Sequence, residues 1–357
     1  MKPILIFIFI AFIMTSCMNN PPEQLATNEN TRDTADLTND FYDNEPVHEL
    51  VIGEIMVNGE VRNPGKVELG SLPLRSVIVK ETLLSGDTNR FVGAYRYDGY
   101  SLYDILDRFI PDKANKEEFP PIIDLYVEIS NQAGEKALFS WGEIYYPVYR
   151  HQIILATRVM EIVPSKTKDH WPVPSASRIV AAPDLITERN ISDPSTITVK
   201  SLSRSFTVDR DKNYSGAVSF YSNDSLLLSF SSLPADWHPV TYPTIFYGRG
   251  RGIHSVTPFA GIMLKDILHT FIPVDRTALR SGLVIIKGID GYRSAFTLSE
   301  IMNRNDQSEA ILVDVGEGKE GGRFRLFTSA DFFSDRAVFA LETILIDIRG
   351  PVPVDSR

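Results

Sequence analysis

The 357-residue sequence predicts an α+β fold built from two tandem copies of one mainly β-stranded unit. Residues 97–111 (YDGYSLYDILDRFIP) and residues 259–273 (FAGIMLKDILHTFIP) repeat one another, including the closing Phe-Ile-Pro. Between the repeated segments, apolar and polar residues alternate in short runs bounded by turn residues, as in β-strands. Helical spacing of apolar residues covers only a few short segments, so strands are expected to dominate.

Each copy is expected to open with a β-hairpin. Residues 55–73 (IMVNGEVRNPGKVELGSLP) alternate on both sides of an Asn-Pro-Gly turn. Residues 214–234 (YSGAVSFYSNDSLLLSFSSLP) repeat the pattern, with Gly216 in place of Gly59 and the same Ser-Leu-Pro ending. Further strands are expected in both copies, at residues 125–130, 152–158, 282–287 and 310–315.

Two short helices are expected in each copy. In residues 101–110, apolar side chains lie at positions i, i+3, i+4 and i+7, and Pro111 is expected to end the helix. The second copy repeats this helix before Pro273. A second short helix is expected at residues 140–144 in the first copy, with Glu143, and at residues 298–302 in the second, with Glu300.

Each copy closes with a segment rich in arginine and aspartate, SRIVAAPDLITERN in the first and FRLFTSADFFSDRA in the second. Arg178 matches Arg325, and Asp184 matches Asp331. An ion pair between the arginine and the aspartate at the end of each strand would account for both residues without a ligand. We therefore predict such a pair in each copy.

The N-terminus has the layout of an export signal. A charged Lys2 precedes an apolar run at residues 4–14, and the only cysteine of the chain, Cys17, follows small residues. This resembles a bacterial lipoprotein signal of residues 1–17, in which Cys17 would be acylated, for instance with palmitate. The alternative is an ordinary cleaved leader with a coincidental cysteine. The resemblance implies a protein anchored in the cell-envelope membrane by lipid, facing the periplasm or the surface.

Residues 18–46 are polar, acidic and poor in large apolar side chains, so they are expected to form a disordered tether. The net charge of the chain is −10, and much of it lies in this segment. The remainder is only mildly acidic, which argues against a nucleic-acid partner. The two copies are assigned to residues 47–199 and 200–350.

The order of motifs in the copies resembles the molybdopterin-binding domain of the sulfite oxidase family. The matching motifs are the opening hairpin, the first helix with its preceding glycine, the Asp290-Gly291-Tyr292 turn and the segment GRFRLFT at residues 322–328. The resemblance implies two degenerate copies of a sulfite-oxidase-like fold. It also implies a cysteine thiolate, between hairpin and helix, that holds molybdenum.

That cysteine is missing from both copies. The corresponding windows, residues 77–95 and 242–258, contain none. We therefore predict neither a catalytic residue nor a metal ligand, and we expect no cofactor. Molybdopterin-dependent oxidoreduction with a non-cysteine ligand is kept as an alternative. A second alternative is an accessory role in polysaccharide export, because VNGEVRNPGKVEL also resembles the β-grasp module of polysaccharide-export lipoproteins.

The strongest candidate binding site is the glycine-arginine segment YGRGRGIHS, residues 247–255. Its glycines allow a ligand to approach the backbone, and Arg249, Arg251 and His254 can bind an anion. Arg325 of the closing strand completes the candidate set. A solvent-exposed loop with hydrated arginines is the alternative. The sequence thus favours a non-catalytic envelope lipoprotein that binds a small anionic ligand or an envelope protein.

Other patterns are interpreted as structural. The six histidines show no spacing of metal ligands. Lys166, Lys168 and His170 are expected to lie in a basic, hydrated loop. The aromatic residues between 141 and 149 are expected to pack between the copies, with a carbohydrate or peptide groove as the alternative.

Overall fold

The computed structural model describes residues 45–348, apart from residues 87, 165, 210 and 319–320. The predicted signal, its Cys17 and all but the end of the predicted tether lie outside the described residues. Strands dominate, and each α-helix spans only five or six residues: α1 (Leu102–Leu106), α2 (Trp141–Tyr145), α3 (Leu264–His269), α4 (Arg276–Ser281) and α5 (Leu298–Met302). The mainly β character that the sequence predicts is confirmed. Within the described part of the chain, no helix is long and apolar enough to span a membrane.

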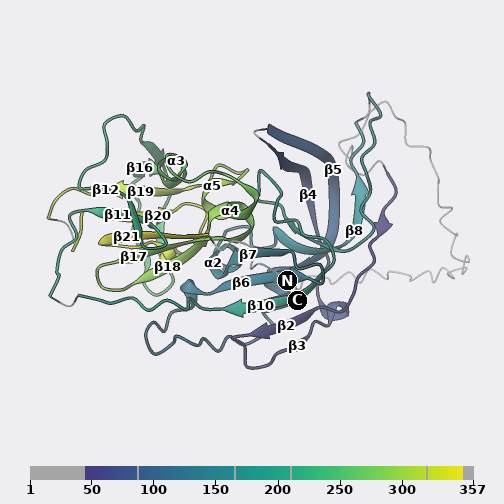
Figure 1. Cartoon of the computed structure of the whole chain (residues 1–357), viewed down its shortest axis with the longest axis horizontal. Helices are drawn as coiled ribbons and strands as arrows, with labels where there is room; N and C mark the ends of the chain where they lie inside the picture. The colour runs from purple at the N-terminus through teal and green to yellow at the C-terminus, as the bar shows by residue number, and fades with distance from the viewer. Residues whose placement is uncertain (1–44, 87, 165, 210, 319–320, 349–357) are drawn as a thin grey trace, which may run out of the picture. The chain divides into compact units, whose positions relative to one another are not determined.

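The two halves of the chain contain sheets of the same topology (Figure 1). In the first half the order is β3 (Gly65–Lys66), β2 (Met56–Gly59), β10 (Pro194–Lys200), β6 (Tyr126–Asn131) and β7 (Lys136–Ser140). In the second it is β12 (Ser225–Phe230), β11 (Val218–Ser222), β21 (Leu341–Ile348), β17 (Gly282–Gly288) and β18 (Arg293–Thr297). In both, the last strand of the half runs parallel to the first hairpin strand and antiparallel to the next neighbour.

A second, antiparallel sheet also recurs. The first half has β1 (His48–Glu49), β8 (Ile153–Glu161), β5 (Thr88–Ser101) and β4 (Arg75–Ser85) in this order, with β9 (Arg178–Ala181) also paired to β8. The second half has β13 (Val240–Tyr242), β16 (Phe259–Met263), β19 (Ala310–Asp314) and β20 (Phe324–Thr328). The second half also has a separate hairpin, β14 (Phe246–Gly248) with β15 (Gly252–Ser255), which has no counterpart among the described residues of the first half.

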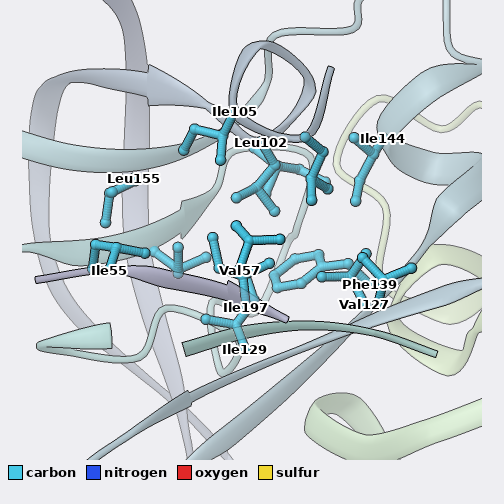
Figure 2. Packing of buried hydrophobic residues seen from close by; sticks show 14 of the residues in the cluster. Ile55, Val57, Leu102, Ile105, Val127, Ile129, Phe139, Ile144, Leu155 and Ile197 are labelled. Carbon is cyan, nitrogen blue, oxygen red and sulfur yellow. The ribbon is translucent and has the colours of Figure 1, made fainter. Parts of the chain in front are cut away.

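Each half has its own hydrophobic core, built from one face of its hairpin sheet and the apolar face of its first helix. In the first half, Val57, Val127 and Phe139 of the sheet pack against Leu102 and Ile105 of α1 (Figure 2). The second half has a corresponding core, built from its own hairpin sheet and its own first helix, α3. A fully buried side chain of this size contributes about 1.5–3 kcal/mol, so these two clusters account for much of the stability of the fold.

Helix α1 is shorter than the sequence predicts. It begins after Ser101, whose hydroxyl accepts the backbone N–H of Asp104 at 3.0 Å, and it ends at Leu106. The carbonyl of Ile110 accepts a hydrogen bond from the backbone of the first hairpin, and Pro111 forms a bridge with that hairpin. The last residues of the predicted helix are therefore bonded to the hairpin and do not continue the helix.

Charged side chains are buried where the two halves meet. The guanidinium of Arg189 forms two hydrogen bonds with Asp184, at 2.6 and 2.8 Å, and two with Glu143, both at 2.9 Å. It also donates to the hydroxyl of Thr297 in the other half, at 3.2 Å, and lies 4.4 Å from the ring centre of Phe139. Arg189 is 1% exposed, so the full set of bonds is needed to offset its desolvation.

Arg336 repeats this arrangement in the second half. It contacts Asp331 at 2.7 and 2.8 Å and Glu300 at 2.6 Å, and it lies 4.4 Å from the ring centre of Phe296. The two clusters are joined crosswise, because Ser140 of the first half donates to Glu300 at 2.7 Å. In the opposite direction, a threonine of the second half donates to a glutamate of the first at 3.1 Å. The repeated residues therefore form one continuous, nearly symmetric network.

The ion pair predicted between Arg178 and Asp184 is wrong. Arg178 lies on β9 and donates to Glu81 at 3.1 and 3.2 Å and to the hydroxyl of Tyr97 at 3.1 Å. Asp184 lies beyond the end of that strand and binds Arg189 instead. The error arises because the two residues are close in sequence but contact different parts of the structure: Arg178 contacts β4 and β5, whereas Asp184 contacts the junction of the halves.

Candidate functional site

The predicted glycine-arginine segment forms the hairpin β14–β15. Gly248 pairs with Gly252, and Arg249, Gly250 and Arg251 form the tip. Gly252 has a φ of +74°, a backbone conformation that favours glycine. A Cβ atom on Gly248 would lie 2.3 Å from Nε2 of His254, so the missing side chain makes room for the imidazole. The glycines therefore shape the hairpin tip and position His254.

A cavity of about 340 Å³ lies against this hairpin. It is lined by residues from the hairpin, from the turn after β17 and from the segment around the 3-10 helix η3 (Ser334–Arg336): Phe246, Gly248, Arg249, Gly250, Arg251, His254, Asp290, Tyr292, Ser334, Asp335, Ala337 and Phe339. Three of the four residues proposed from the sequence thus line one cavity. The fourth, Arg325 on β20, lies behind its wall, with its guanidinium 4.6 Å from the ring centre of Phe339.

The hairpin is held against η3 by one hydrogen bond and several ring contacts. The hydroxyl of Ser334 donates to the carbonyl of Tyr247 at 2.9 Å. The ring of Tyr247 lies 5.7 Å from that of Phe332, and Phe246 packs 5.8 Å from Phe339. Aromatic pairs at such distances add about 0.5–1.5 kcal/mol each beyond burial. These contacts keep the arginine-bearing tip next to the second wall of the cavity.

The second wall contains the Asp290-Gly291-Tyr292 turn. Oδ1 of Asp290 accepts the backbone N–H of Tyr292 at 3.0 Å, and Gly291 has a φ of +83°. The hydroxyl of Tyr292 donates to the backbone carbonyl of Asp335. Burial and the nearby charge of Asp335 raise the pKa of Tyr292 to about 12, although Arg249 opposes the shift. The phenol therefore stays protonated at neutral pH and holds the turn to η3.

The charged groups of the cavity are not paired with one another. Arg249 and Arg251 are exposed, and within the described residues neither forms a hydrogen bond or an ion pair through its side chain. On the other wall, Oδ2 of Asp335 is buried and has no hydrogen-bond partner among the described residues. The cavity therefore offers unpaired donors from the hairpin, whereas the unsatisfied oxygen of Asp335 has almost no accessible surface.

A larger cavity, of about 550 Å³, lies where the halves meet. Its charged lining includes Glu143, Asp184 and Arg189, which bind one another, and Glu300, which binds Arg336. Because their hydrogen bonds are satisfied within the network, they have little left to offer a ligand. We therefore assign this cavity a structural role. The exposed Tyr149, which lies at its border, is assigned the same role.

The aromatic residues near α2 pack mainly within the protein. Trp141 stacks on Tyr145, with ring centres 4.5 Å apart. Tyr146 joins an apolar cluster that includes Tyr292 and Phe333 of the other half. Tyr146 thus packs between the copies, as the sequence predicts. Trp141 instead belongs to the core of the first half.

Ser101, Asp104 and His151 lie together but do not form a catalytic triad. Nδ1 of His151 is 3.1 Å from the hydroxyl of Ser101 and 3.4 Å from the carboxylate of Asp104. In a triad, one ring nitrogen faces the nucleophile and the other faces the acid. Here the same nitrogen faces both groups, and Ser101 is fully buried as a helix cap. The cluster stabilises the start of α1.

The residues that the sequence resemblance would place near a metal form ordinary strands. The window at residues 77–95 belongs to the β4–β5 hairpin, and the window at residues 242–258 contains β14 and β15. Among the described residues, no group of three or more histidine, cysteine, aspartate or glutamate side chains is arranged to hold a metal. The described residues also contain no thiolate, the soft ligand that molybdenum would require.

Comparisons with known protein families, with curated proteins and with solved structures found no match. The resemblance to the sulfite oxidase family therefore stays a prediction. The cavity at the β14–β15 hairpin is the candidate binding site.

Proposed function

We propose that this protein is a non-catalytic binding protein of the bacterial cell envelope, which takes a small anionic ligand in the cavity at the β14–β15 hairpin. One observation carries the proposal: Arg249, Arg251 and His254 line the same cavity, and the two arginines have no partner within the described residues. The envelope location rests on the sequence around Cys17.

The chemistry of the hairpin favours an anion with several oxygen atoms. Guanidinium groups present a planar set of N–H donors that match a carboxylate or a phosphate. The imidazole of His254 adds a third donor when it is protonated. A cavity of about 340 Å³ is of the size that holds small metabolites.

The other polar groups of the cavity favour binding over catalysis. The hydroxyl of Tyr292 is held by a backbone carbonyl, and burial keeps its pKa high, so it is a poor nucleophile and a poor acid. The hydroxyl of Ser334 also donates to a backbone carbonyl, and no base is bonded to it among the described residues. A nucleophile needs such a base.

The proposal is tested by removing both cations of the hairpin tip. Isothermal titration calorimetry would measure the binding of inorganic phosphate and of small carboxylates to the wild type and to Arg249→Ala with Arg251→Ala. Hydrogen bonds to charged groups contribute about 1.5–3 kcal/mol each, so we expect affinity to fall at least about tenfold.

The matched control is Arg62→Ala with Arg90→Ala, which removes two exposed arginines from the first half. This double variant has the same net charge as the test variant and should bind like the wild type. Absence of binding by the wild type, or an equal loss in both double variants, would contradict the proposal.

A further inference from the structure

The cavity at the β14–β15 hairpin contains two carboxylates as well as its two arginines. Asp290 comes from the turn after β17, and Asp335 comes from η3. Both therefore belong to the second wall of the cavity, the one not formed by the hairpin. Two positive and two negative side chains leave the lining close to neutral when His254 is uncharged. A site built only for an anion would not need the two acids.

Asp335 is the more informative of the two carboxylates. Its Oδ2 is buried and accepts no hydrogen bond from the described residues. Leaving such a group unsatisfied costs about 1–3 kcal/mol, and more when the group is charged. Asp290, by contrast, uses Oδ1 to hold its own turn. Because Oδ2 has almost no accessible surface, a ligand donor reaches it, and removes this cost, only once the Asp335 side chain turns toward the cavity.

The positions of the opposite charges set the size of such a ligand. Arg249 lowers and Asp335 raises the pKa of both Tyr146 and Tyr292, so the two charged groups act on the same two hydroxyls. They nevertheless form no ion pair with each other in the structure. Both residues line the same cavity of about 340 Å³, which a short molecule can bridge.

We infer that the ligand of this cavity is a small zwitterion, with a phosphate or carboxylate group for Arg249 and Arg251 and an ammonium group for Asp335. The inference rests on the proposed function and specifies its ligand class. An anion without the ammonium gains the arginine contacts but faces repulsion from the two acids. A zwitterion satisfies both walls at once.

The test compares ligands that differ only in the ammonium group. Phosphoethanolamine is paired with propyl phosphate, and γ-aminobutyrate with pentanoate, so that a methyl group replaces the ammonium in each pair. Titration calorimetry with the full chain should give at least about tenfold tighter binding of each zwitterion, since a charged hydrogen bond contributes about 1.5–3 kcal/mol.

Asp335→Asn should reduce this preference to threefold or less and leave propyl phosphate bound at least as tightly as in the wild type. The control Asp236→Asn removes an exposed carboxylate that does not line the cavity, and it should keep the full preference. Thermal denaturation of Asp335→Asn would show whether the variant is folded.

The outcomes distinguish a failure of the zwitterion inference from a failure of the proposed anion site. If the wild type binds the anions and their zwitterionic partners equally well, the zwitterion inference is wrong and the anion site stands. An unchanged preference in folded Asp335→Asn likewise overturns the role of Asp335. If neither member of either pair binds, the proposed function itself fails.

Discussion

Four carboxylates share two guanidiniums at the junction of the halves. Because the carboxylates outnumber the guanidiniums, the pKa values of individual acidic residues are affected. Burial raises the pKa of Glu143, and the charge of Glu300 adds to the shift, although Arg189 opposes it. Burial likewise raises the pKa of Asp331. The network therefore retains a proton more readily than free carboxylates would.

This gives a prediction about pH. A carboxyl group whose pKa is higher in the folded than in the unfolded state stabilises the fold at low pH, and that contribution is lost as the pH rises above the usual value of 4.5. The unfolding free energy of the wild type minus that of Glu143→Gln should therefore fall between about pH 4.5 and pH 7.5. Urea denaturation across this range measures it.

Glu128→Gln is a control of opposite sign. Partial burial tends to raise the pKa of Glu128, but hydrogen bonds and charge from Lys200 and Lys136 outweigh it and the pKa is lowered. The corresponding difference for Glu128 should rise with pH up to about pH 4.5 and stay level above it. A flat or rising curve for Glu143 would contradict the prediction.

Among single residues, the sequence identified the cations of the candidate site but not their acidic neighbours. Arginines between glycines are conspicuous in any sequence, which is why Arg249 and Arg251 were expected to act together. Asp335 stands out less in the sequence. It precedes Arg336 in the closing segment, at the position that Glu188 occupies in the aligned segment of the first copy. Only its position beside the hairpin gives it significance.

At the scale of elements, helix α2 shows how the two halves constrain each other. Gly142 lies in α2, and a Cβ atom there would lie 2.2 Å from Nη1 and 2.3 Å from Cδ of Arg336. Arg336 is clamped by carboxylates and cannot move without breaking the network. The equivalent position in α5 is Ser299, which donates to Asp184 at 3.2 Å.

We predict that Gly142→Ala destabilises the protein by about 1–3 kcal/mol, the usual cost of overpacking a core. In an unconstrained helix the same change would stabilise by about 0.5–1 kcal/mol, so the sign of the effect is diagnostic. Urea denaturation would measure it. Gly70→Ala, where a Cβ atom would meet nothing within 4 Å, should leave stability nearly unchanged. A Gly142→Ala protein as stable as the wild type would show that the contact is not tight.

The elements themselves were largely predictable, because periodicity is local. The opening hairpin of each half forms where the alternation predicts it. Helix α5 spans the predicted residues 298–302, and strand β17 begins at the predicted Gly282. The first helix was predicted too long, since Pro111 forms a bridge with Val61, which lies 50 residues earlier between β2 and β3.

For the whole molecule, the anchoring prediction concerns residues outside the described part. If Cys17 is acylated, bacteria that express the protein and are fed an alkyne-bearing palmitate should incorporate the label into the wild type and not into Cys17→Ser. Ser16→Ala keeps the thiol and should keep the label. A wild-type protein without label would refute the lipid anchor and leave an ordinary leader as the alternative.

The sequence alone determined that this chain is mainly β, that its segments recur, and that one short segment places arginines between glycines. These properties depend on residues near one another in the chain. Tertiary structure decided which segments meet: it brought Asp290 and Asp335 to the arginine hairpin and joined Arg189 with Arg336 across the halves. Such contacts depend on the order of strands in the sheets, which local patterns do not encode.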